Sequence, residues 1–125
     1  MSLGDQSVDA AVAAAVEVVG THCCTTAIRE LPWLSALVGV QVLAKLEFQQ
    51  PTGSFKIRGA FNALATNHDR IAIAASAGNH ALAIAYAARK LGRAFRICLP
   101  ATASALKREK LTNFGAQLEF HGDSL

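Results

Sequence analysis

Residues 71–99, IAIAASAGNHALAIAYAARKLGRAFRICL, carry a strand, a helix and a second strand in direct succession. Residues 71–76 form an apolar run of strand length, and residues 80–91 are predicted to form a helix that ends at Gly92. Residues 95–99 have the apolar character of another buried strand. A helix that joins two buried strands predicts a parallel pair with a right-handed crossover.

The alternation of strands and helices continues on both sides of this stretch. Residues 40–48 are predicted to form a strand, residues 51–54 (PTGS) a turn, and residues 55–65 a helix. One face of that helix carries Ile57, Ala60, Phe61 and Leu64. A further helix is predicted at 103–113 and a last strand at 116–120. The fold class is therefore α/β, with a parallel sheet and flanking helices.

An apolar helix is predicted before these elements, at residues 8–19, with Ser7 as its cap and Gly20 as its end. Its apolar face carries Val8, Ala11, Val12, Ala15, Val16 and Val19. We expect this helix to dock onto the rest of the protein, after which residues 21–26 form a polar link. Its apolar face would also suit an interface between copies of the chain, and a homo-oligomer is expected.

Length and composition restrict the class of protein. A chain of 125 residues with 52% apolar residues matches one packed domain. Its 12 basic and 9 acidic residues are scattered, with a single local basic cluster at 107–110, so no nucleic-acid partner is expected. The start of the chain lacks a basic targeting region, and the first apolar stretch is too short to span a bilayer. We expect a soluble, cytoplasmic protein without a membrane partner.

The three cysteines, Cys23, Cys24 and Cys98, cannot all pair, and adjacent cysteines rarely close a disulfide with each other. A reducing cytoplasm therefore suits the chain. His22 lies beside two of them, but the C-x-x-C spacing of a zinc site is missing. We expect an inert, buried cysteine pair and no metal site.

Two loops precede predicted helices at the carboxyl ends of predicted strands, where unpaired N–H groups favour anions. The first, QQPTGS, leads to Lys56 and is predicted to cap the helix with Ser54. A lysine in a first helical turn is placed against the helix dipole. Lys56 is thus either an exposed surface lysine or a nucleophile for an aldehyde cofactor such as pyridoxal phosphate.

The second loop, SAGNH, also has two interpretations. Ser76 and Asn79 are common turn and cap residues, and Gly78 could supply a left-handed conformation in a purely structural loop. Alternatively, Asn79 binds a ring substituent and the loop N–H groups bind a carboxylate. In that case both loops would face one pocket.

The runs KLEFQQPTGSFKIRGAFNAL (45–64) and SAGNHALAIAYAARKLG (76–92) resemble the N-terminal part of the pyridoxal-phosphate-dependent threonine/serine dehydratases, in the tryptophan-synthase-β-like fold group. The resemblance implies that Lys56 binds pyridoxal phosphate covalently, that Phe55 packs against its ring and that Asn79 contacts its 3-hydroxyl. The residues implied to bind the substrate carboxylate are Ser76, Ala77, Gly78, Asn79 and His80. The reaction implied is α,β-elimination of L-threonine or L-serine to a 2-oxo acid and ammonia, with Lys56 as nucleophile and base.

Two departures from the family pattern matter. Ala77 stands where serine racemases carry a serine that acts as acid or base, so dehydration is favoured over racemisation. The family's glycine-rich phosphate loop is missing, and its members are more than twice as long, so the chain is expected to be a fragment. Residues 1–50 are expected to pack on a larger domain, while residues 51–125 form a small α/β domain. The alternatives are a catalytically silent module that binds a small anion or a protein, and a racemase-type enzyme.

Overall fold

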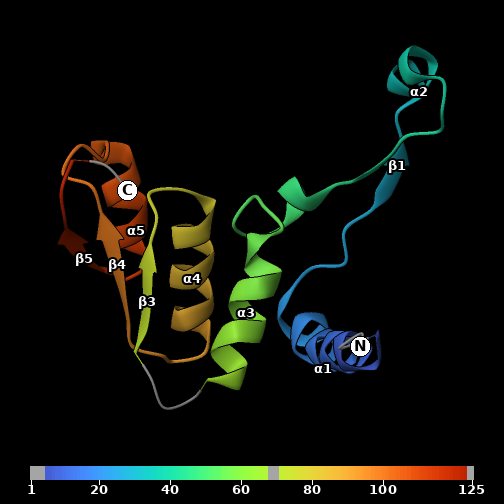
Figure 1. Cartoon of the computed structure of the whole chain (residues 1–125). Helices are drawn as coiled ribbons and strands as arrows, with labels where there is room; N and C mark the ends of the chain where they lie inside the picture. Colours follow the sequence, from blue (N-terminus) through green and yellow to red (C-terminus); the bar gives the residue numbers. More distant parts are fainter. Residues whose placement is uncertain (1–4, 68–70, 124–125) are drawn as a thin grey trace.

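The computed structural model describes residues 5–67 and 71–123 of the chain (Figure 1). Its main sheet has three parallel strands, β3 (Ala72–Ala75), β4 (Phe95–Leu99) and β5 (Gln117–Phe120), in the order β3-β4-β5. The helices α3 (Lys56–Thr66), α4 (Asn79–Lys90) and α5 (Ala105–Asn113) alternate with these strands. The prediction of an α/β fold with a parallel sheet is confirmed.

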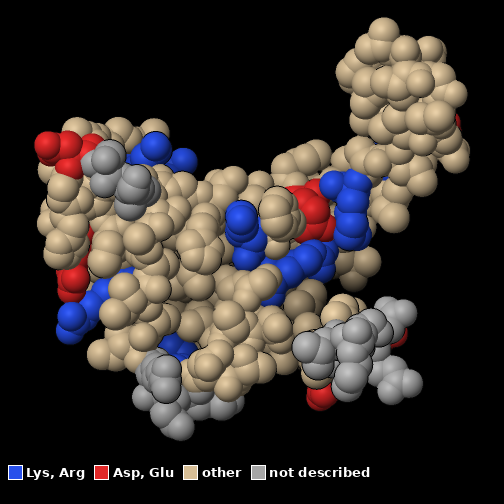
Figure 2. Space-filling model, viewed as in Figure 1, with Lys and Arg blue, Asp and Glu red and all other residues tan. Residues whose placement is uncertain are grey.

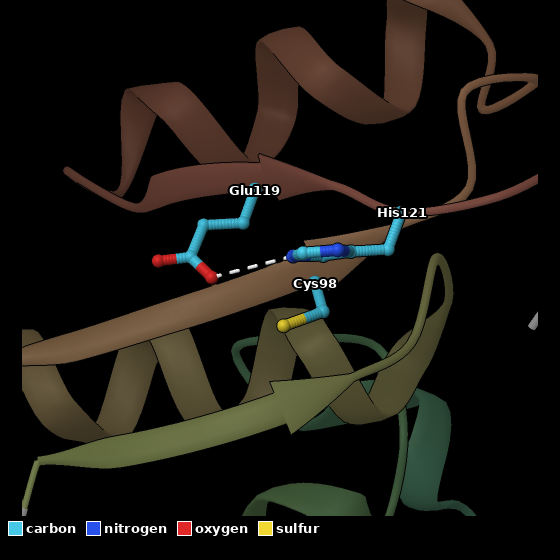
Figure 3. Close-up of side chains that lie close together, drawn as sticks. All are labelled: Cys98, Glu119 and His121. Carbon is cyan, nitrogen blue, oxygen red and sulfur yellow. Dashed lines mark ion pairs between the residues drawn. The ribbon is translucent and has the colours of Figure 1, made fainter.

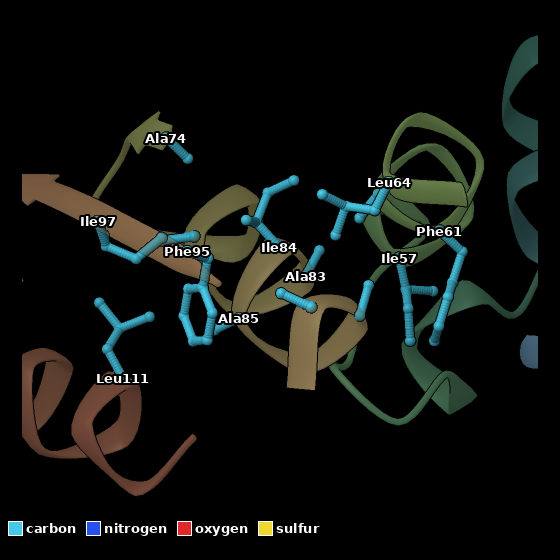
Figure 4. Close-up of a cluster of buried hydrophobic side chains, with 14 of the residues drawn as sticks. Ile57, Phe61, Leu64, Ala74, Ala83, Ile84, Ala85, Phe95, Ile97 and Leu111 are labelled. Carbon is cyan, nitrogen blue, oxygen red and sulfur yellow. The ribbon is translucent and has the colours of Figure 1, made fainter. Parts of the chain in front are cut away.

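Helix α4 lies between the sheet and α3 and is buried on most sides (Figures 1 and 4). Its buried residues are Ala81, Ala83, Ile84, Ala85, Ala87 and Ala88. Small side chains on several faces allow a helix to pack closely against a sheet on one side and another helix on the other.

The core lies on one face of the sheet (Figure 4). The predicted face of α3 is confirmed, because Ile57, Ala60, Phe61 and Leu64 are all buried. The ring of Phe61 stacks on His22 at 4.5 Å between centroids and meets Tyr86 edge-on at 6.2 Å. These two ring contacts join α1, α3 and α4.

Helix α1 (Asp5–His22) differs from the prediction at both ends and in its orientation. It begins before Ser7 and continues through Gly20, so neither residue delimits it. A glycine inside a helix costs only about 1 kcal/mol relative to alanine, and the helix continues past Gly20 to His22, whose ring stacks on Phe61. The valines at positions 8, 12 and 16 are exposed, whereas Val18 packs against the core. Of the predicted face only Ala15 and Val19 are half-buried, so the side of the helix that meets the body overlaps the predicted face only in part.

Residues 28–45 form an arm that projects from the body (Figure 1). The strand predicted at 40–48 is only β2 (Leu43–Lys45), and the 3-10 turn η1 (Glu47–Gln49) follows it. Strand β2 pairs antiparallel with β1 (Ile28–Glu30), which the sequence analysis missed, in a separate two-stranded sheet.

Helix α2 (Pro32–Val38) lies between the two strands of the arm and was also missed. A proline at the helix start and Gly39 in the left-handed conformation (φ 73°) at its end are ordinary helix boundaries. The exposed apolar side chains from β1 to η1 are Ile28, Trp33, Leu37, Val38, Val40, Leu43 and Phe48. In Figure 2 the end of the arm shows no Lys or Arg. Among the described helices, none is long and apolar enough to cross a membrane.

Candidate active site

The N-termini of α3 and α4 lie at the carboxyl edge of the parallel sheet (Figure 1). Lys56 is the first residue of α3, and Asn79 is the first residue of α4. The N–H groups of a first helical turn have no acceptor within the helix. This edge therefore presents a lysine and a set of free backbone donors, as the sequence predicted.

The turn before Lys56 is confirmed, but its predicted cap is wrong. Gly53 adopts φ 72°, and its N–H donates to the carbonyl of Gln50 at 2.7 Å. The residue that precedes the helix is Phe55, and Ser54 makes no capping hydrogen bond. The hydroxyls of Thr52 and Ser54 are buried, and neither has a hydrogen-bond partner in residues 5–67 and 71–123. Ser54 is buried and leaves the first turn of the helix without a side-chain cap.

Lys56 is exposed and lies at the rim of an open depression of about 450 Å³. Phe55, Gly59 and His80 also line this depression. The amine nitrogen of Lys56 is 5.3 Å from the centroid of the Phe55 ring. Since His80 belongs to the first turn of α4, the depression connects the lysine turn with the SAGNH loop.

The SAGNH loop leaves the sheet at Ser76, whose N–H donates to the carbonyl of Cys98 at 3.2 Å. The Ser76 hydroxyl accepts a hydrogen bond from the N–H of Gly78 at 3.2 Å. Gly78 has φ −128°, so it does not supply the left-handed conformation that a purely structural loop could have used. Gly78, Asn79 and His80 are all exposed, and Ser76 and Ala77 are half-buried.

The loop faces two neighbouring hollows. His80 lies on the side of Lys56, whereas Ala77, Gly78 and Asn79 line a second hollow of about 250 Å³. Lys56 and His80 thus line the same depression, whereas Asn79 lines the second hollow. Lys107 and Lys110 of α5 also line the second hollow. The sequence analysis noted them only as part of the local basic cluster at 107–110, although their i, i+3 spacing places them on one side of a helix.

A partly buried polar network holds the lysine turn to the start of the arm. Arg58 donates to both carboxylate oxygens of Glu47, and Thr26 donates to the same carboxylate at 2.6 Å. The hydrogen bonds from Arg58 lower the pKa of Glu47 from 4.5 to about 2. The side-chain amide of Gln50 pairs with the backbone of Cys24, accepting at 3.1 Å and donating at 2.7 Å. These contacts fix the position of the turn from which Lys56 projects.

All three cysteines are free thiols. Cys24 is exposed, so the prediction of a buried pair is wrong. Cys23 is half-buried, and this burial raises its pKa. The two residues differ because the chain leaves α1 here, where one side chain turns toward the core and the next toward solvent.

The family of pyridoxal-phosphate-dependent enzymes matches residues 19–125. The chain belongs to this family. It is 43% identical to the mouse protein named L-serine dehydratase/L-threonine deaminase over 103 residues, which are 80% of this chain and 32% of the relative. The curated relatives it matches are much longer, and the chain spans about a third of the length of the first of them.

Solved structures of this family share the fold. Processed threonine deaminase isoform 2 from Solanum lycopersicum has a TM-score of 0.84 at 28% identity, covering 97% of this chain and 35% of that one. Maize serine racemase has a TM-score of 0.83 at 29% identity, covering 93% of this chain and 36% of that one. Both a deaminase and a racemase therefore share this arrangement of strands and helices.

The residues on this edge fit one side of pyridoxal phosphate. An exposed primary amine, an adjacent aromatic ring and two unpartnered hydroxyls surround the lysine turn. The free N–H groups of α4 lie beside them. The sequence contains no glycine-rich loop that would surround the cofactor phosphate. These groups are chemically suited to one side of the cofactor.

Proposed function

We propose that this chain supplies the lysine-bearing part of an active site that converts L-threonine or L-serine to a 2-oxo acid and ammonia with pyridoxal phosphate. The observation that carries the proposal is the depression shared by Lys56 and His80 at the carboxyl edge of the sheet. The printed name of the mouse relative supports the reaction class. The rest of the site would come from segments that the longer relatives have and this chain does not.

In this proposal Lys56 binds the cofactor through its amine, Phe55 packs against the cofactor ring, and Asn79 bonds a ring substituent. Pyridoxal phosphate, when bound, supplies an electron sink for negative charge at the substrate Cα. Lys56 Nζ would hold the cofactor and, as a free amine, would lie next to the substrate Cα. It then accepts the proton from Cα, so that one residue serves as nucleophile and as base.

The substrate carboxylate would bind at the SAGNH loop, formed by Ser76, Ala77, Gly78, Asn79 and His80. The first-turn N–H groups of α4 carry the partial positive charge of a helix N-terminus, which favours an anion. The N–H of Gly78 is already bound to Ser76 Oγ, so it holds the shape of the loop. The N–H groups that follow it are the donors for the carboxylate.

A serine racemase-type activity is the second candidate, since maize serine racemase shares the fold. Inversion needs an acid or base on each face of Cα. Ala77 has no group that titrates, and Lys56 alone serves one face. Elimination is therefore the favoured outcome.

We also propose that residues 1–50 bind to the part of the protein that longer relatives contain, and that residues 51–125 form the small domain. The exposed apolar side chains of the arm support this proposal, because a projecting arm with few charges gains stability when it is covered (Figure 2).

The experiment is a chimera in which residues 19–125 replace the matching segment of the mouse relative. We expect it to form keto acid from L-threonine and to lose this activity in Lys56→Ala, while Lys90→Ala, a change to another exposed lysine, retains it. Borohydride reduction with pyridoxal phosphate should label Lys56 in peptide mapping. A folded chimera labelled only at other lysines, or one equally active without Lys56, contradicts the proposal.

The same chimera tests the choice of reaction. We expect keto acid to form far faster than D-serine, and Ala77→Ser to raise the ratio of inversion to elimination. Chiral analysis that finds D-serine as the main product would favour the racemase alternative.

A further inference from the structure

The face of the parallel sheet opposite α4 is not covered by any element of the described chain, and it carries a polar cluster near its carboxyl edge (Figure 3). Cys98 of β4 pairs in register with Glu119 of β5. Paired residues of a parallel sheet lie on the same face, and residues two apart on an extended chain also share a face. His121, two residues after Glu119, therefore joins them.

The side chains converge as well as the backbone. The thiol sulfur of Cys98, a carboxylate oxygen of Glu119 and a ring nitrogen of His121 all lie within 4.8 Å of one another. His121 Nε2 is 3.6 Å from Glu119 Oε2. Cys98 is half-buried and anchors the cluster, whereas the side chain of His121 is 70% exposed and free to rotate.

Arg96 orients the carboxylate. Its Nη1 donates to Glu119 Oε1 at 3.0 Å, which leaves Oε2 directed toward His121. Metal-binding carboxylates are commonly held in this way, with one oxygen bound to an outer residue and the other to the ion. A thiolate and a carboxylate together balance the two positive charges of a divalent cation.

We propose that Cys98, Glu119 and His121 form a binding site for a zinc-class divalent cation. Sulfur, imidazole and carboxylate are the ligand types of Zn²⁺, and three of them leave the fourth tetrahedral position for water. Zinc bonds of this kind hold neighbouring ligand atoms roughly 3.3–3.8 Å apart. Small rotations of the half-buried Glu119 and the exposed His121 side chains would bring the three ligand atoms to these distances. The ion links β4 to β5 on the open face and is separate from the core face on which α4 packs.

The test uses the reduced 125-residue chain and Co²⁺ as a spectroscopic substitute for Zn²⁺. We expect one equivalent of Co²⁺ to produce sulfur-to-metal charge-transfer absorption, and one equivalent of Zn²⁺ to remove it by competition. Cys98→Ser should abolish the absorption. Glu119→Gln and His121→Ala, both at exposed or partly exposed positions, should each weaken binding by at least about tenfold. The thiol proton is released on binding, so affinity should rise with pH.

Cys24→Ser is the matched control, since it removes an exposed thiol two residues after His22 and should leave the spectrum unchanged. Circular dichroism of each variant shows whether it remains folded. Absorption that persists in Cys98→Ser, or that is lost in Cys24→Ser, overturns the proposal and assigns the ion to residues 22–24. Binding that is equal in all variants, or absent from the unaltered chain, overturns it as well.

Discussion

The guanidinium of Arg58 donates two hydrogen bonds to the carboxylate of Glu47, from Nε to Oε2 at 2.9 Å and from Nη2 to Oε1 at 2.8 Å. Arg58 lies two residues after Lys56, and Glu47 lies where the chain returns from the arm. Paired bonds of this kind fix both distance and orientation. The lysine turn therefore depends on a contact between two segments that are eleven residues apart.

The first prediction concerns pH. The pKa of Glu47 is lowered from 4.5 to about 2 in the folded chain, so its stabilising effect is complete above about pH 4.5 and is lost as the pH falls toward 2. One pKa unit corresponds to about 1.4 kcal/mol, so the effect is at most about 3 kcal/mol in the free energy of unfolding. Urea unfolding of Glu47→Gln should show lower stability at pH 7 and a weaker dependence on pH between 5 and 2.

Glu17→Gln is the control for this measurement, because Glu17 is exposed on α1. It should unfold like the unaltered chain at every pH. Equal pH profiles for the unaltered chain and Glu47→Gln would show that the Arg58 contact contributes nothing to stability.

The second prediction concerns Gln50, a buried side chain with 3% exposure. Gln50→Ala leaves the backbone N–H of Cys24 without its partner and removes the shorter of two hydrogen bonds to the Cys24 carbonyl, which also accepts from Arg58 Nη2 at 3.3 Å. We expect a loss of about 1–3 kcal/mol in the free energy of unfolding. Gln49→Ala, at the exposed neighbouring position, should change it by less than about 0.5 kcal/mol. Similar losses of unfolding free energy in both variants would contradict a specific role for the hydrogen bonds between the Gln50 amide and the Cys24 backbone.

The third prediction compares two phenylalanines. Phe61 is 1% exposed and joins three helices through its ring contacts, so Phe61→Ala should lower the free energy of unfolding by about 3–5 kcal/mol. Phe48 is 68% exposed, and Phe48→Ala should change the free energy by less than about 0.5 kcal/mol. Thermal unfolding followed by circular dichroism measures both, and the reverse order would contradict the core described above.

The fourth prediction uses Trp33, the single tryptophan of the sequence, which is 68% exposed on α2. Its fluorescence in dilute solution should be quenched by iodide as readily as that of a free indole. The surrounding apolar side chains favour association, so quenching should weaken as the protein concentration rises. A Trp33 that is shielded at every concentration would show that the arm folds back on its own chain.

The fifth prediction concerns activity of the chain alone. Incubated with pyridoxal phosphate and L-threonine, it should form no measurable keto acid, because no glycine-rich loop holds the cofactor phosphate and the open depression admits water. Sustained keto-acid production that disappears in Lys56→Ala would show that this third of the relatives' length is sufficient.

The local pattern of apolar residues was enough to predict the helices and strands in the central part of the molecule. The apolar run at 71–76 and the alanine-rich segment at 80–91 predicted every end of β3 and α4 to within one residue, because strand and helix periodicities are set by neighbours along the chain. The buried face of α3 followed from the same spacing. The motifs around Lys56 and Asn79 were sufficient to indicate the family that residues 19–125 match.

Tertiary packing decided which side of α1 is buried and which distant side chains meet. The spacing of Val8, Val12 and Val16 defined an apolar face of α1 but did not say what covers it, and the contact with Phe61 turned inward a side of the helix that overlaps the predicted face only in part. Likewise, Cys98 and Glu119 are 21 residues apart and meet only because β4 and β5 pair in one register. Periodicity along a chain determines which side chains share a face, whereas the partner of that face depends on contacts between distant segments, which no local pattern contains.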